Sequence, residues 1–241
     1  MGKGICTVVV LLVGLIGCEG PTGPPGQQGE KGTKGDRGDV GPPGEPGMGG
    51  TVFAAEFGAP SEISAWTKTS KGGTWEVSGG KLSLTSTSDK YYQSVFSSKS
   101  FSGDLDITTS CRWVDGDGNF GIWFFRGQNG GYGFLLSPVG SYSFGSWVPS
   151  PEGGDSYVFS AIIGETSKAV IEPYGTNTLH ARVRGSLITL FVNGKQVGEA
   201  VDSTSSQGVV GLMVAPRTTA AFDNLYVTEI TTHPLTKPVA E

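Results

Sequence analysis

The fold class is decided by residues 187–197, which read LITLFVNGKQV. Two runs of apolar and β-branched residues flank the pair Asn193-Gly194. Both central residues of a type I′ turn need left-handed backbone, which Asn and Gly adopt readily, and this turn matches the twist of antiparallel strands. The stretch therefore predicts a tight β-hairpin.

Similar short runs fill residues 51–230 on both sides of this hairpin. They are rich in Val, Thr and aromatic residues, are separated by Gly, Ser, Asn and Asp, and include no segment with a convincing helical period. The predicted strands are Thr74–Val77, Lys81–Thr85, Tyr92–Phe96, Leu105–Trp113, Phe120–Arg126, Tyr132–Ser137, Ser141–Val148, Thr178–Arg184, Leu187–Val192, Lys195–Val201, Val209–Ala215 and Ala221–Ile230. Many short strands with regular turn signals indicate an all-β sandwich or barrel.

Several of these strands resemble a known family. The hairpin, together with His180–Arg184, Gly208–Leu212 and Ala221–Leu225, resembles the last strands of concanavalin A-like jelly rolls such as legume lectins, laminin G modules and family 16 glycoside hydrolases. Gly118–Gly127 resembles the Asn-x-Gly-Ile-…-Arg-Gly strand of the bacterial 3-keto-disaccharide hydrolase domain, with one residue of difference in spacing. The resemblance implies a concanavalin A-like jelly-roll sandwich at residues 51–230, a fold that hosts many functions.

The first 17 residues have the features of a secretory signal peptide. A short basic start at Lys3 precedes an apolar run, Val8–Ile16, that is too short to span a bilayer. Leu15-Ile16-Gly17-Cys18 resembles the bacterial lipobox, which implies that Cys18 is lipidated and becomes the mature N-terminus. We therefore expect a lipid-anchored protein of the bacterial cell envelope, held on a membrane or the cell surface. The alternative is a plain secretory signal with a chance cysteine.

Residues 18–50 contain a collagen-like repeat. Glycine occupies every third position from Gly20 to Gly50, eleven positions without a break. Three chains wound around one axis leave space there only for a hydrogen atom, so the repeat predicts a triple-helical stalk and a homotrimer. A flexible glycine-rich linker is the alternative, but it needs no period. Arg37-Gly38-Asp39 matches an integrin-binding tripeptide, although charge pairing between chains explains the same residues.

Charge and composition exclude several classes of protein. The 241 residues include 17 Lys and Arg against 22 Asp and Glu, a net charge of −5, and the cations form no stripe, so a nucleic-acid partner is not expected. Two His and three Cys are too few for a zinc site. Cys6 leaves with the leader and Cys18 carries lipid, so Cys111 is expected to be a small buried hydrophobe. Residues 231–241 are expected to form a flexible tail.

Residues 113–147 are dense in aromatic side chains, which favours a glycan-binding face. Strand alternation would turn Ile122, Phe124 and Arg126 to one face and Trp123 and Phe125 to the other, so both faces are apolar. One aromatic face could then stack on sugar rings while Arg126 binds hydroxyls or a carboxylate. The candidate ligand-binding residues are Trp123, Phe125, Arg126, Tyr132, Tyr142 and Trp147. The alternative is that all of these side chains belong to the sandwich core.

A calcium site has one candidate, formed by Asp115, Asp117 and Asn119. Their alternating oxygens resemble the start of an EF-hand loop. Phe120 stands where that loop needs glycine, and Arg126 stands where it needs a bidentate Glu. A tight Asp-Gly hairpin explains the same residues without a metal, so no cofactor is expected.

An enzyme site finds little support in the sequence. Retaining glycosidases need two carboxylates about 5–5.5 Å apart, and the nearest pair, Asp104 and Asp106, is expected to cap a turn. His180, Arg182 and Arg184 alternate on what should be a solvated strand face. The preferred hypothesis is therefore a trimeric lipoprotein with non-catalytic heads that bind glycans or another surface ligand. A glycoside-active enzyme of the 3-keto-disaccharide hydrolase type and a purely structural protein with a trimerising head are the alternatives.

Overall fold

The hairpin at residues 187–197 is present in the structure, a computed structural model that describes residues 51–68, 72–151 and 157–230. Strand β12 (Leu187–Val192) pairs antiparallel with β13 (Lys195–Val201). The turn residues Asn193 and Gly194 have φ angles of 51° and 76°. These are the left-handed values that a type I′ turn requires, so the hairpin prediction is confirmed.

Nine strands of the described residues form one antiparallel sheet, called sheet A. Its main path is β13, β12, β11 (Thr176–Arg184), β6 (Leu105–Asp115), β15 (Thr219–Phe222), β4 (Lys81–Ser86) and β3 (Gly73–Ser78). Beside this path, β16 (Leu225–Glu229) pairs with β6 and with β1 (Thr51–Ala55). Strand β6 is long enough for β15 and β16 to pair with it one after the other along the same edge.

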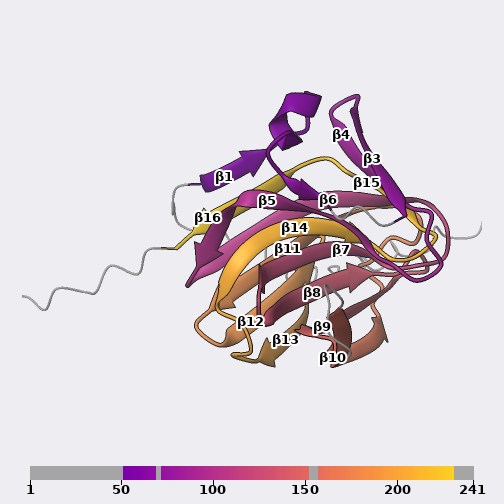
Figure 1. Cartoon of the computed structure of the whole chain (residues 1–241). Coiled ribbons are helices and arrows are strands. Elements are labelled where there is room, and N and C mark those ends of the chain that lie inside the picture. The colour runs from indigo at the N-terminus through magenta and orange to yellow at the C-terminus, as the bar shows by residue number, and fades with distance from the viewer. Residues whose placement is uncertain (1–50, 69–71, 152–156, 231–241) are drawn as a thin grey trace, which may run out of the picture. The chain divides into compact units, whose positions relative to one another are not determined.

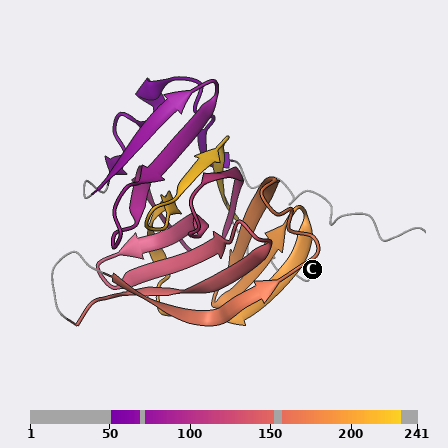
Figure 2. The same ribbon diagram turned by 90° about the vertical axis from the view of Figure 1, so that its right-hand side faces the viewer.

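Seven strands form the second antiparallel sheet, called sheet B. Their order is β10 (Tyr157–Ser167), β9 (Ser141–Pro149), β8 (Gly130–Leu136), β7 (Phe120–Gly127), β14 (Gln207–Val214), β5 (Gln93–Ser102) and β2 (Thr67–Lys68). Figures 1 and 2 show the two sheets as the layers of a sandwich. Apart from η1 (Pro60–Ile63), a single 3-10 turn, the described residues contain no helix. The all-β sandwich prediction is confirmed, and the architecture is consistent with a jelly roll.

No helix in the described part of the chain has the length and apolar character needed to cross a membrane.

The predicted strand Ala221–Ile230 is interrupted in the structure. Asp223 donates its backbone N–H to the carbonyl of Ser110 at 2.9 Å, and the Asn224 side-chain oxygen accepts from the Ser110 N–H at 3.1 Å. The amide side chain of Asn224 thus takes a ladder position that a backbone carbonyl would occupy. Asp223 and Asn224 lie outside the regular ladder and separate β15 from β16.

The sequence prediction omitted three strands, β1, β2 and β10. Strand β10 pairs only with β9 within sheet B, and most of its residues are exposed and none is buried. An edge strand of this kind carries a weak period-2 signal, which explains the omission.

The core between the sheets is filled with aromatic and aliphatic side chains from both. Phe124, Tyr132 and Phe144 pack as a group of rings with centroid distances of 5.4–6.3 Å. Cys111 is 1% exposed, as expected for a small buried hydrophobe, and burial raises the pKa of its thiol. Stability of the described head therefore comes from packing, because Cys111 is its one cysteine and is free.

Several predictions fall outside the described residues. These are the signal peptide at 1–17, the lipidated Cys18 and collagen-like stalk at 18–50, with Arg37-Gly38-Asp39, and the tail at 231–241.

The ring group in the core generates a stability prediction. Phe144→Ala removes a fully buried ring and should lower the free energy of unfolding by about 3–5 kcal/mol. Val139→Ala, at a side chain that is 60% exposed, should change it by less than about 0.5 kcal/mol. Urea denaturation of the full chain, followed by circular dichroism, measures both values. Equal effects of the two substitutions would contradict this description of the core.

Candidate functional site

The outer face of sheet B carries a second layer of aromatic side chains, which we call the aromatic face. Its buried floor comes from five strands, and its partly buried rim includes residues of the omitted strand β10. The floor consists of Phe96, Trp123, Leu135, Trp147 and Met213, and the rim consists of Tyr92, Tyr157, Phe159 and Val209. Trp123 and Trp147 stack in the centre with ring centroids 5.1 Å apart.

Glycines on neighbouring strands make room for these rings. A Cβ atom added to Gly133 would lie 2.5 Å from Trp147 Nε1, and one added to Gly131 would lie 2.8 Å from Trp123 Nε1. Phe96 lies over Gly211 in the same way, and a Cβ atom added to Gly211 would lie 2.5 Å from Phe96 Cδ1. The rings therefore lie close against the strands, which explains why Trp123 and Trp147 are only 5% and 3% exposed.

A β-bulge decides which side chains reach the aromatic face. The register of β7 against β8 shifts between Phe124 and Gly127, and Phe125 has a φ of 54° in the left-handed region. Phe125 therefore turns into the core beside Phe124, and Arg126 turns outward to join Trp123. The predicted alternation of Phe125 and Arg126 is wrong because a bulge inserts one residue and resets the period.

Arg126 lies among three aromatic rings. Its guanidinium carbon is 4.6 Å from the centroid of Phe96, 5.6 Å from that of Tyr157 and 5.7 Å from that of Trp123. Its Nε is buried without a hydrogen-bond partner, and no described residue forms an ion pair with it. Trp123 Nε1 and Trp147 Nε1 are also buried donors without a partner. The aromatic face thus holds a cation and unused hydrogen-bond donors.

The structure separates the six predicted ligand-binding residues into two groups. Trp123, Arg126 and Trp147 lie on the aromatic face, as described above. Phe125, Tyr132 and Tyr142 lie in the core between the sheets, each at most 2% exposed, so they are not available to a ligand at the surface.

The two core tyrosines have internal hydrogen-bond partners. Tyr132 donates its hydroxyl to Asp202, and Tyr142 donates to the carbonyl of Val197 at 2.7 Å. Burial and the Asp202 hydrogen bond raise the pKa of Tyr132 to about 12. The sequence analysis missed the rim residues Tyr157 and Phe159, although their spacing of two along the chain is a strand signal.

The loop with the calcium candidates is held by hydrogen bonds to its backbone carbonyls. Trp113 Nε1 donates to the carbonyl of Gly116 at 2.9 Å, and the carbonyl of Asn119 accepts from Ala215. Asp115 and Asp117 are exposed. Nowhere in residues 51–68, 72–151 and 157–230 do three or more His, Cys, Asp or Glu side chains form a group that could hold a metal ion.

Asp106 is the centre of a charge cluster on the outer face of sheet A. Its carboxylate accepts from His180 at 2.8 Å, from Arg182 at 2.9 Å and from Arg184 at 2.9 Å, and it is 5% exposed. Burial alone would raise its pKa, but these hydrogen bonds outweigh burial and hold the pKa far below its usual range. The expectations of a turn-capping Asp106 and a solvated face of cations are therefore wrong. Asp104, by contrast, accepts from the Gly185 N–H at 2.8 Å, as a turn residue does.

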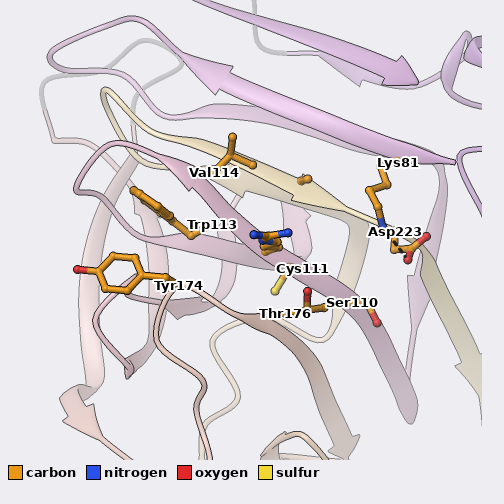
Figure 3. A pocket seen from close by; sticks show the side chains of 10 residues that line it. Lys81, Ser110, Cys111, Trp113, Val114, Tyr174, Thr176 and Asp223 are labelled. Atoms are coloured by element: carbon orange, nitrogen blue, oxygen red, sulfur yellow. Dashed lines mark hydrogen bonds and ion pairs between the residues drawn. The ribbon is translucent and has the colours of Figure 1, made fainter. Parts of the chain in front are cut away.

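A depression of about 490 Å³ lies elsewhere on sheet A, and we call it the sheet A depression. Figure 3 shows Trp113 and Tyr174 together at one end, Lys81 and Asp223 together at the other, and Ser110 and Thr176 between them. Its lining residues are Lys81, Ser110, Cys111, Arg112, Trp113, Val114, Tyr174, Thr176, Ala221 and Asp223.

Comparison with protein families identifies the head. A family model described as the 3-keto-alpha-glucoside-1,2-lyase-like domain matches residues 58–228. The chain belongs to this family. The resemblance drawn from Gly118–Gly127 is thereby confirmed. No curated protein matches the lyase-like domain or the rest of the chain.

Solved structures share the fold of this lyase-like domain. The carbohydrate binding module CBM66 from Bacillus subtilis has a TM-score of 0.57 and 21% identity over 69% of this chain and 97% of its own. A galectin-like protein of unknown function from Bacillus subtilis has a TM-score of 0.54 and 12% identity over 75% and 96%. A GlcNAcα1-4Gal-releasing endo-β-galactosidase from Clostridium perfringens has a TM-score of 0.57 and 11% identity over 77% and 64%. At these identities the likeness establishes the fold.

The Asp106 cluster makes the stability of the lyase-like domain depend on pH. Because the folded pKa of Asp106 is depressed, its contribution is present above the unfolded pKa of about 4 and is lost as the pH falls toward the folded value. Asp106→Asn should cost roughly 3 kcal/mol at pH 7, since it leaves the partly buried Arg182 and Arg184 without their anion. The variant should also lose less stability than the wild type between pH 5 and pH 3.

Urea denaturation at pH 7, 5 and 3 measures this difference. Asp117→Asn, at an exposed carboxylate, is the matched control and should behave as the wild type does. Parallel pH profiles for the wild type and Asp106→Asn would contradict the assignment.

Proposed function

We propose that the head binds glycans through the aromatic face, and that it is presented by a lipid-anchored collagen-like trimer in the bacterial cell envelope. The observation that carries the binding proposal is Arg126, a cation held among three rings with no partner in the described residues. A carbohydrate-binding or glycosidase-like jelly roll is the type of domain to which the chain belongs, and its fold is shared with a carbohydrate binding module. This makes a carbohydrate the first class of ligand to test.

The aromatic face suits a sugar for physical reasons. A pyranose presents a flat face of C–H groups, which packs on aromatic rings, and a rim of hydroxyl oxygens, which accept hydrogen bonds. Tyr92, Tyr157 and Phe159 are the partly exposed rings of the face, whereas Trp123 and Trp147 form the floor beneath them. The guanidinium of Arg126 supplies several donors in a fixed plane, and such charge-assisted bonds are stronger than neutral ones. Stacking on the rim and donation from Arg126 together can orient one sugar residue.

Trimerisation would strengthen a weak site. Three heads linked by one stalk convert the second and third binding events into intramolecular ones, so the avidity of the trimer can exceed the affinity of one head by orders of magnitude. Lipid chains on Cys18 would hold this trimer at a membrane, because several chains anchor a protein where one does so only marginally. Both ideas rest on the sequence of residues 1–50.

A glycoside-active enzyme is the second candidate function, and the family match favours it. The aromatic face, as described, consists of rings, aliphatic side chains and one guanidinium, which are groups for binding and for stabilising negative charge. Incubating the full chain with a 3-keto-glucoside and following the products by chromatography separates the two candidates. Turnover would favour the enzyme, whereas binding without turnover supports the proposal. A trimer that shows neither would favour a structural role.

The binding proposal predicts the effect of rim substitutions. Tyr157→Ala and Phe159→Ala should each weaken binding about 10-fold, which corresponds to about 1.4 kcal/mol of lost stacking. Arg126→Gln should weaken it by at least as much. A glycan array of the full chain identifies the strongest oligosaccharide, and isothermal titration calorimetry with that oligosaccharide gives the affinities.

Tyr226→Ala is the matched control for these titrations. Tyr226 is a partly exposed tyrosine on β16 of sheet A, where its hydroxyl bonds Glu56. Its removal should leave the affinity unchanged. Binding that survives all three substitutions on the aromatic face would place the ligand elsewhere.

The anchor and the stalk predict the state of the mature protein. Mass spectrometry should find acyl chains on Cys18, and Cys18→Ser should move the protein from the membrane fraction to the soluble fraction. Sedimentation of the detergent-extracted protein should give a trimer. Gly35→Ala should lower the melting temperature of the triple helix, because a methyl group does not fit on its axis. A monomer would refute the stalk, and an unmodified Cys18 would refute the anchor.

A further inference from the structure

The sheet A depression contains an exposed cation that no described residue neutralises. Arg112 lies on the outer face of β6, opposite Thr176 on one neighbouring strand and Ala221 on the other. Both neighbours are small, so the guanidinium is not shielded from the sides. Arg112 has no ion pair or hydrogen-bond partner among the described residues. It differs in this respect from Arg182 and Arg184 on the same sheet, which are bound to Asp106.

One end of the depression carries an aromatic pair in a constrained geometry. Tyr174 is 53% exposed, and its φ of 55° is in the left-handed region, which costs a residue other than glycine of order 1 kcal/mol or more. Its N–H donates to the carbonyl of Pro138 at 2.9 Å, which holds this conformation. Its ring meets that of Trp113 edge to face at 5.0 Å, and the indole is fixed in turn by its bond to Gly116. The fold therefore holds the exposed ring of Tyr174 in place although the backbone conformation of this residue is unfavourable.

The other end of the depression carries a donor and an acceptor. Lys81 and Asp223 form an ion pair at 3.0 Å, and both side chains are about half exposed, so they can still bind a ligand. The charged residues that line the depression are Lys81, Arg112 and Asp223, so its net charge is +1 on a chain of net charge −5. Ser110 and Thr176 add hydroxyl groups between the two ends (Figure 3).

We propose that the sheet A depression is a second ligand site, separate from the aromatic face, and that it takes a sugar bearing a carboxylate, such as a hexuronic acid. The carboxylate would bind Arg112 in the bidentate geometry that guanidinium favours. The sugar ring would pack on Tyr174, and its hydroxyls would bind Ser110, Thr176 and the Lys81–Asp223 pair. The volume lies in the range of roughly 300–1,000 Å³ that is usual for small-molecule sites. From Ser110 to Trp113 the depression follows β6 for about 10 Å, at about 3.3 Å per residue, so an oligosaccharide can lie along it.

Two probes of equal length test the proposal. The acidic probe is a hyaluronan tetrasaccharide, which contains glucuronic acid, and the neutral probe is tetra-N-acetylchitotetraose. Calorimetric titration of the full chain should show binding of the acidic probe and at least 10-fold weaker binding of the neutral one. Arg112→Gln and Tyr174→Ala should each weaken binding of the acidic probe at least 10-fold. Lys195→Gln removes the same charge from an exposed position on β13 and should leave the affinity unchanged.

A further variant separates recognition from folding. Arg112→Lys keeps the charge but loses the bidentate geometry, so it should retain the unfolding midpoint of the wild type and bind the acidic probe more weakly. The proposal is overturned if the wild type does not bind the acidic probe, if both probes bind equally, or if Arg112→Gln and Lys195→Gln have the same effect. Tyr157→Ala alters the aromatic face and leaves the sheet A depression unchanged, so its effect on binding tests the first proposal only. The two proposals can therefore fail separately.

Discussion

The central strands of sheet B, β7, β8 and β9, are buried on both faces, and this constraint shapes most of the head. One face supplies half of the core between the sheets, and the other is covered by rings that originate from sheet B itself. A ring can approach a strand this closely only where the adjacent residue has no side chain, and glycine lies beside Trp123, Trp147 and Phe96. Glycine in a strand costs roughly 0.5–1 kcal/mol relative to alanine. Burying a large ring over each glycine offsets that cost.

The same constraint explains how far the sequence could predict the molecule. Hairpin β12–β13 was predictable because Asn193-Gly194 is a local signal, and the family could be recognised from Gly118–Gly127. The orientation of the aromatic side chains was not predictable, because β7, β8 and β9 are apolar on both faces and alternation cannot say which face is the core. The bulge at Phe125 then exchanges the faces to which Phe125 and Arg126 point. The partners of Tyr132 and Tyr142, Asp202 and Val197, lie 70 and 55 residues away in the sequence.

The arginines show why residue type alone does not define a site. Arg182 and Arg184 are bound to Asp106, which lies 76 and 78 residues from them in the sequence, and they are therefore structural. Arg126 is packed between rings, and Arg112 stands on an open strand face among small neighbours. In the sequence these four residues look alike, and only the register of β6 against β11 assigns two of them to Asp106. The pairing of strands thus decides which of these four arginines have an ion-pair partner among the described residues.

The pairing of β1 with β16 has a mechanical consequence. The first and last strands of the described head lie side by side, with Thr51 opposite Thr228 (Figure 1). Any tension that reaches the head along the preceding chain enters at Thr51 and is carried first by the five residues of β1, which pair with one strand only. With one partner strand, β1 is the first strand that we expect to separate under load, and its separation would expose Phe53 and Ala55. The residues of the aromatic face and of the sheet A depression lie on other segments of the chain.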